Sequence, residues 1–127
     1  MQVRGKIMDL TIEKVTISAD HEDDILIVRC HGRLDVFSTP DIEKMIADHV
    51  RQGCHKLVLN LHEVTFMSSA GIKMLLAMSV KLRLAQGKFV ICEPSTIVLH
   101  ILRASGFIHV IEIAEDEKNA LSILNEG

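Results

Sequence analysis

The apolar positions in the first part of the chain follow the spacing of β-strands. Residues 10–18 are rich in β-branched side chains, but their apolar alternation slips between Ile12 and Val15, which predicts a bulge or an edge strand. Residues 25–28 are apolar without alternation, as in a strand that is covered on both faces. The polar residues 20–24 predict a turn, so the two strands are expected to pair as a β-hairpin.

After this hairpin the apolar spacing alternates between the periods of helices and strands. Helices are expected over residues 40–52, 70–86, about 95–105 and 116–124, and strands over residues 57–61, 89–92 and 108–113. Thr39 is expected as the N-cap of the first helix and Pro40 as its first residue, while Gly53 and Gly87 are expected to end the first two helices. This order predicts an α/β fold, in which a largely parallel sheet begun by a β-hairpin carries packed helices.

The length and composition fit one domain with an aliphatic core. Residues 1–127 are expected to form a single domain whose core spans about residues 10–124. The chain has no Trp or Tyr and only four Phe, so aromatic platforms for bases or sugars are not expected. Its three cysteines, Cys30, Cys54 and Cys92, lie within or beside apolar runs, which favours buried thiols over disulfides or metal ligands.

Charge and motif content exclude several other classes of function. The formal net charge of -3 provides no basic face for nucleic acid or for an anionic membrane. No apolar run approaches the roughly 20 residues of a membrane span, and the N-terminus lacks the features of a secretory signal, so a cytoplasmic location without membrane insertion is expected. The seven histidines lack the spacing of zinc ligands, and no glycine-rich nucleotide motif is present, so neither a metal nor a cofactor is expected.

The candidate functional stretch is the junction between the strand over residues 57–61 and the helix that follows it. Residues 66–72 of this junction read Phe-Met-Ser-Ser-Ala-Gly-Ile. In open α/β sheets, sites gather at the carboxyl ends of the strands, where loops pass into helices. The serine pair lies at such a strand end, and so does the connection over residues 35–39.

The two serines admit a structural role and two chemical roles. As a helix N-cap, a serine contributes about 1 kcal/mol, and if Ser68 is the cap, the hydroxyl of Ser69 is free to face solvent. A nucleophilic serine of the hydrolase type needs glycine at the position of Met67, and no histidine is singled out as a base, so hydrolysis is disfavoured and no enzyme is expected. A phosphoacceptor is the second chemical alternative, because a helix N-terminus accommodates the added charge without unfolding and so permits a binary binding switch.

Three segments, in this order and spacing, resemble the STAS-domain anti-sigma factor antagonists of bacteria. They are residues 32–35 (Gly-Arg-Leu-Asp), residues 58–61 (Val-Leu-Asn-Leu) and the serine stretch at residues 66–72. The resemblance covers roughly residues 10–124, including residues 87–90 and 104–107. In that family the antagonist binds an anti-sigma factor that is also a serine kinase, and so frees the sigma factor. The kinase, which binds the ATP, phosphorylates one serine and abolishes binding, and a PP2C-type phosphatase restores it.

The resemblance also assigns roles to residues of this chain. It places the phosphoacceptor at Ser69, with Ser68 as a secondary candidate, where several members of the family have Asp instead. The docking residues that it implies are Asp35, Ser38, Thr39, Ser68, Ser69, Ala70 and Gly71. The alternative is a STAS subunit of a transport or sensory complex, in which the serine is not a phosphorylation switch.

Overall fold

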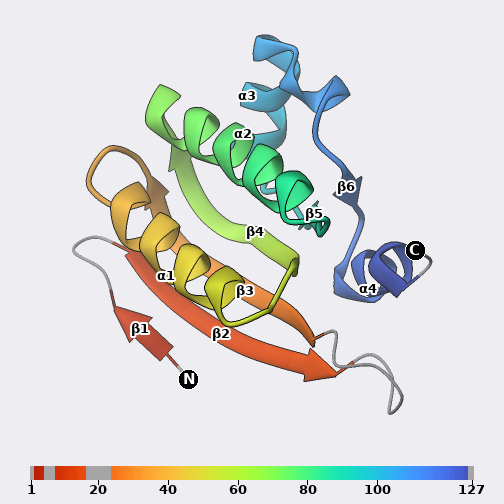
Figure 1. Ribbon diagram of the computed structural model, residues 1–127. Coiled ribbons are helices and arrows are strands. Elements are labelled where there is room, and N and C mark those ends of the chain that lie inside the picture. The colour runs from red at the N-terminus through yellow and green to blue at the C-terminus, as the bar shows by residue number, and fades with distance from the viewer. Residues whose placement is uncertain (1, 5–7, 17–23, 126–127) are drawn as a thin grey trace.

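The strands of the computed structural model, which describes residues 2–4, 8–16 and 24–125, form one sheet whose order follows the chain (Figure 1). They are β1 (Gln2–Arg4), β2 (Met8–Thr16), β3 (Asp24–Leu34), β4 (Lys56–Met67), β5 (Lys88–Cys92) and β6 (Ile113–Ala114). β1, β2 and β3 pair antiparallel, whereas β3 through β6 pair parallel. The predicted α/β fold, with a largely parallel sheet begun by a hairpin, is therefore confirmed.

Helices cover both faces of this sheet. The described part of the chain contains α1 (Thr39–Arg51), α2 (Ser69–Leu84), α3 (Thr96–Ser105), α4 (Glu117–Asn125) and a short 3-10 helix, η1 (Phe107–His109). α1 and α2 lie side by side over one face, and the buried side of α3 joins the same core (Figure 1). Within the described ranges, α4 is the helix that packs against the other face. Among the described residues, no helix is both long and apolar enough to cross a membrane.

Side chains along each strand alternate between the two faces, which produces two separate clusters of buried residues. In β4, Leu57 and Leu59 belong to the core under α1, α2 and α3, whereas Val58 belongs to the core under α4. Each of these three side chains is at most 2% exposed. β4 is therefore covered on both faces, as expected of a parallel strand in the middle of a sheet.

The first helix begins one residue earlier than the sequence predicted. Ser38, not Thr39, is the N-cap, and Pro40 lies in the first turn as expected. The N–H groups of Ser38 and Thr39 already donate to the backbone carbonyl of Asp35, at 3.2 and 3.0 Å, so a tight turn leads directly into the helix. The Ser38 side chain makes no cap hydrogen bond, because its Oγ atom accepts from Asp35 N–H at 3.0 Å and donates to the carbonyl of Arg33.

The predicted strand over residues 108–113 is wrong for most of its length. Residues 107–109 form η1, and only Ile113 and Ala114 pair with β5. Phe107 and Ile108 pack against the main core from this turn rather than from the sheet. Residues 108–113 read Ile-His-Val-Ile-Glu-Ile, a stretch too short and too irregular in its apolar spacing to distinguish a strand from a partly buried turn.

Two alternatives were predicted for β2, a bulge or an edge strand. β2 and β3 pair without interruption from Met8 opposite Gly32 to Thr16 opposite Asp24, so the bulge is absent from the described residues of β2. Residues 12–16 are an edge segment among the described residues, because β1 pairs only with residues 9–11. The register shifts occur instead between β3 and β4. β1 covers only a short part of β2, and the acidic residues 20–23 lie outside the described residues.

Two glycines follow helices, and they serve different purposes. Gly53 follows α1 in a left-handed conformation with φ of +95°, which confirms it as the end of that helix. After α2 the left-handed residue is Gln86, with φ of 61°, so the prediction that Gly87 caps the helix is wrong. Gly87 is needed for a different reason: a Cβ atom there would collide with the backbone carbonyl of His55.

We expect Gly87→Ala to destabilise the fold more than Gly53→Ala. The His55 carbonyl is fixed because it accepts a hydrogen bond from Lys88 N–H at 2.9 Å, so the added methyl group forces the backbone apart at a cost of about 2–3 kcal/mol. A Cβ atom on Gly53 would have no neighbour within 4 Å, so Ala there costs only the left-handed strain of about 1–2 kcal/mol. Urea denaturation of both variants measures the difference, and equal losses would contradict the steric role of Gly87.

Candidate functional site

The candidate site lies where the ends of β3 and β4 meet. Leu34 at the end of β3 is paired with Met67 at the end of β4. The loop that leads into α1 and the residues that lead into α2 therefore lie at the same edge of the sheet (Figure 1). The loop over residues 35–38 (the Asp35 loop) therefore lies beside Ser68 and Ser69, as the sequence predicted from their positions at strand ends.

A close backbone approach fixes the start of α2 against β3. The N–H of Ser68 donates to the carbonyl of Leu34 at 2.9 Å. Gly71 is buried one turn further on, and a Cβ atom there would lie 2.9 Å from the same carbonyl oxygen and 2.6 Å from Cγ of Met67. Gly71 is thus a packing residue of the junction, and Ala70 beside it is half-buried.

Ser68 occupies the N-cap position of α2, but its side chain does not cap. Its backbone is extended, with φ of -88° and ψ of 178°, and its carbonyl accepts from Ile72 N–H at 3.1 Å. Its Oγ atom is buried and has no hydrogen-bond partner among the residues that the structure describes. The expected cap is therefore confirmed for the backbone position and wrong for the hydroxyl.

Ser69 is the first residue of α2, and its side chain is exposed. The first turn of α2 contains no acidic residue, and the exposed Lys73 follows four residues later on the same side of the helix. The N-terminus of a helix carries a partial positive charge and unpaired N–H groups. An anion attached to Ser69 would thus meet a favourable electrostatic environment.

Hydrogen bonds within the Asp35 loop hold its backbone in one conformation. One Asp35 carboxylate oxygen accepts from the N–H groups of Phe37 and Ser38, at 3.0 and 3.3 Å. The other oxygen accepts from Arg33 Nε at 3.3 Å. Asp35, Ser38 and Thr39 are only 8%, 1% and 6% exposed, so they are placed to shape the loop from inside.

The Asp35 loop exposes two apolar side chains to solvent. Val36 and Phe37 are 63% and 62% exposed, although the core elsewhere buries most large apolar residues. The polar residues of the loop were predicted from the sequence, whereas these two were missed. The available signal was an apolar pair in a short polar connection, where no helix or strand period required one.

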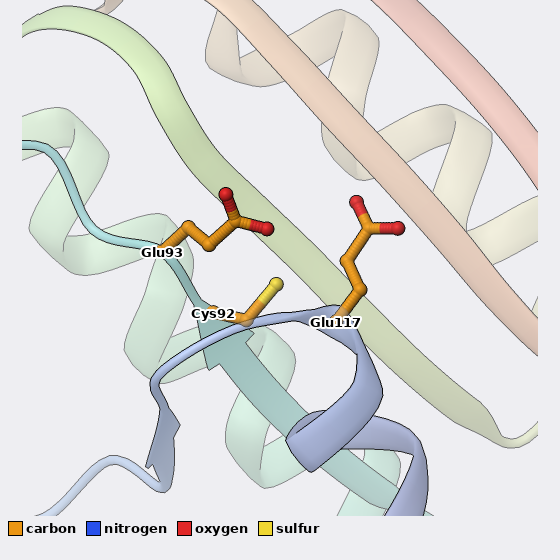
Figure 2. A group of neighbouring side chains, drawn as sticks. All are labelled: Cys92, Glu93 and Glu117. Carbon is orange, nitrogen blue, oxygen red and sulfur yellow. The ribbon is translucent and has the colours of Figure 1, made fainter.

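A second group of polar side chains lies on the face of the sheet that α4 covers. Arg29, Asn60 and Cys92 are neighbours in register across β3, β4 and β5. Glu93 follows β5, and Glu117 is the first residue of α4 (Figure 2). The register of the sheet brings these five residues together, and no spacing in the sequence indicated the group.

Hydrogen bonds hold the two carboxylates of this second group. Arg29 binds both oxygens of Glu117, through Nε and Nη2 at 2.7 Å each. The Asn60 amide donates to Glu117 at 2.7 Å and to Glu93 at 3.1 Å. The hydrogen bond from Arg29 is the main reason that the pKa of Glu117 is lowered, against the opposing effect of burial.

The Cys92 thiol lies beside these carboxylates. Burial raises its pKa to about 12, and the charges of Glu117, Glu93 and Asp116 add to this effect, while Arg29 opposes it. Cys30 and Cys54 are also buried and outside any disulfide of the described residues, which confirms the predicted thiols. The protonated thiol is therefore the stable form of Cys92 in the absence of another cation.

Comparisons with known proteins agree with this arrangement. Residues 16–120 match the family model of the STAS domain. The chain is 29% identical over 113 residues to BtrV of Bordetella bronchiseptica, covering 89% of this chain and 91% of that protein. It is 32% identical over 110 residues to the anti-sigma F factor antagonist of Paenibacillus polymyxa, covering 85% of this chain and 93% of that protein.

The fold is also that of a solved anti-sigma factor antagonist, SpoIIAA. Its unphosphorylated form matches with a TM-score of 0.72 at 22% identity, over 90% of this chain and 95% of SpoIIAA. The phosphorylated form of SpoIIAA from Bacillus matches with a TM-score of 0.63 at 20% identity, over 89% and 98%. Because the family model spans most of the sequence and the relative from Paenibacillus matches over nearly its full length, the chain belongs to the STAS-domain family of anti-sigma factor antagonists.

Proposed function

We propose that this chain is an anti-anti-sigma factor that is switched by phosphorylation of Ser69. In its unphosphorylated form it binds an anti-sigma factor that is a serine kinase, and the sigma factor is released. The kinase uses its own ATP in the cytoplasm to phosphorylate Ser69, which ends the interaction, and a PP2C-type phosphatase restores it. The observation that carries the proposal is an exposed serine at the N-terminus of α2, beside the exposed Val36 and Phe37.

The difference in exposure between the two serines supports Ser69 as the acceptor. Phosphoryl transfer requires the attacking hydroxyl to lie in line with the γ-phosphate of ATP, so the hydroxyl must be reachable by the kinase. The Ser69 side chain is exposed, whereas the Ser68 hydroxyl is buried against the junction. In addition, neither hydroxyl is hydrogen-bonded to a histidine among the described residues, so this site offers no activated nucleophile of the hydrolase type.

Phosphorylation at Ser69 would act on the partner rather than on the fold. A phosphate adds about -1.5 to -2 charges, which the N-terminus of α2 and the nearby Lys73 tolerate in the free protein. A partner that covers Val36 and Phe37 would also cover the adjacent phosphate and would have to remove its hydration. Burying an unpaired charge in this way costs several kcal/mol, enough to convert a stable complex into a negligible one.

We expect Ser69→Ala protein to receive no phosphate from the cognate anti-sigma kinase and ATP. Ser68→Ala protein is the matched control, because its hydroxyl is buried and unpaired, and it should be phosphorylated like the wild type. Mass spectrometry of the digested proteins locates the phosphate. Wild-type phosphorylation of Ser69→Ala protein would overturn the site assignment.

Ser69→Asp is expected to weaken binding to the anti-sigma factor by at least about tenfold, or ~1.4 kcal/mol. The aspartate places a carboxylate where the partner must exclude water, although one carboxylate has less charge than a phosphate. Ser69→Ala should bind like the unphosphorylated wild type, and isothermal titration calorimetry measures all three affinities. Equal affinities for Ala and Asp would favour the alternative, a transport or sensory STAS subunit without a phosphorylation switch.

Phe37→Ala should weaken the same complex by more than about 1 kcal/mol, because exposed aromatic side chains are frequent anchors of interfaces. Stability should be nearly unchanged, since Phe37 is 62% exposed in the free protein. Leu84→Ala removes another large apolar side chain, 80% exposed at the far end of α2, and should leave the affinity unchanged. If both variants bind with wild-type affinity, the Asp35 loop is not part of the interface.

A further inference from the structure

The second group of polar side chains contains a set of metal-ligand atoms. Sγ of Cys92 and one carboxylate oxygen each from Glu93 and Glu117 all lie within 4.8 Å of one another, and the three side chains converge (Figure 2). Bond lengths of about 2.0 Å to oxygen and 2.3 Å to sulfur place the ligand atoms of a tetrahedral zinc ion with one sulfur ligand about 3.3–3.5 Å apart. Small rotations of the two glutamate side chains would close the remaining distance.

Neighbouring residues already orient the two carboxylates. Asn60 Nδ2 donates to both Glu93 and Glu117, and Asn60 Oδ1 in turn accepts from His62 N–H at 2.9 Å. Arg29 holds Glu117 from its other side. Ligating carboxylates in metal sites are held by such second hydrogen bonds, and the bonds from Asn60 and Arg29 leave at least one lone pair of each carboxylate for the ion.

The buried thiol is a separate observation that points to a cation. Cys92 is 0% exposed, its Sγ points toward the two carboxylates, and it has no hydrogen-bond or disulfide partner in the described part of the chain (Figure 2). Glu93 and Glu117 each bring a carboxylate oxygen within 4.8 Å of this sulfur. The position between the sulfur and the carboxylates is therefore one where a positive charge is favoured.

An open cavity gives access to this position. It has a volume of about 560 Å³ and is lined by residues that include Asn60, Glu93 and Glu117. The cavity lies at the carboxyl end of β5, beside the middle of β4 and the start of α4. A hydrated ion can enter from this side, and a water molecule from the cavity can remain as a fourth ligand.

We propose that Cys92, Glu93 and Glu117 bind one divalent cation of the zinc type, with water as the fourth ligand. On binding, the thiol loses its proton to solvent and the sulfur takes the metal as thiolate, while Arg29 keeps one oxygen of Glu117. The thiolate selects Zn²⁺, Co²⁺ or Cd²⁺ over Mg²⁺ and Ca²⁺, which prefer oxygen ligands alone. The site lies on the α4 face of the sheet, and it does not depend on the role proposed for Ser69.

Titration of the full chain with Co²⁺ tests the ligand set, because a thiolate bound to Co²⁺ gives a charge-transfer band in the near ultraviolet. We expect the band to saturate at one Co²⁺ per chain and to disappear on addition of Zn²⁺. Cys92→Ser should abolish it, and Glu93→Gln should weaken Co²⁺ binding at least about tenfold while preserving side-chain volume. Cys54→Ser, a second buried thiol away from the cavity, is the control and should keep the band.

The thiolate band separates this site from histidine binding. Binding of Co²⁺ to His31 or His62, which line the same cavity, would involve no thiolate and would give no such band. Because each bound cation displaces the thiol proton of Cys92, the Co²⁺ affinity should also rise with pH. A band that survives in folded Cys92→Ser protein, or an affinity that does not change with pH, would overturn the proposal.

Discussion

The parallel pairing of β3 with β4 is the contact that brings the Asp35 loop and Ser69 together as one candidate docking surface. Leu34 lies opposite Met67, and the Leu34 carbonyl accepts the N–H of Ser68 while Gly71 packs closely against it. The Asp35 loop and the serine junction therefore both begin at strand ends that are hydrogen-bonded to each other. A shift of one residue in this register would turn the serines and the Asp35 loop away from each other, because successive side chains of a strand point to opposite faces.

The same junction gives two adjacent serines different environments. Ser68 ends the extended segment, so its hydroxyl is directed into the junction, whereas Ser69 begins the helix and faces solvent. The change from extended to helical backbone between them rotates one side chain relative to the other. Of the two serine hydroxyls, only that of Ser69 is therefore accessible to a kinase, as a phosphorylation switch at a single position requires.

Much of the fold could be predicted because apolar periodicity is a local property that each helix and strand carries in its own sequence. Prediction failed where local signals were ambiguous, as in residues 108–113, or where a hydroxyl had competing partners, as in Ser38. The serine junction was found because a strand, two serines and a helix are consecutive. Cys92 and Glu117 were not associated, because only the sheet register and the position of α4 bring them together.

The two proposed sites lie on one sheet but would affect the protein in different ways. β4 contributes Asn60 to the α4 face and leads at its end to Ser69 beside the loop of the other face. A cation bound at Cys92 favours the folded state over the unfolded state by about 1.4 kcal/mol for each tenfold excess over its dissociation constant. Its proposed ligands include no residue of the serine junction and neither Val36 nor Phe37, so we expect the same cation affinity for the phosphorylated and unphosphorylated forms. A ligand without such a difference cannot shift the balance between two states, so in the proposed scheme a phosphate on Ser69 alone would control partner binding.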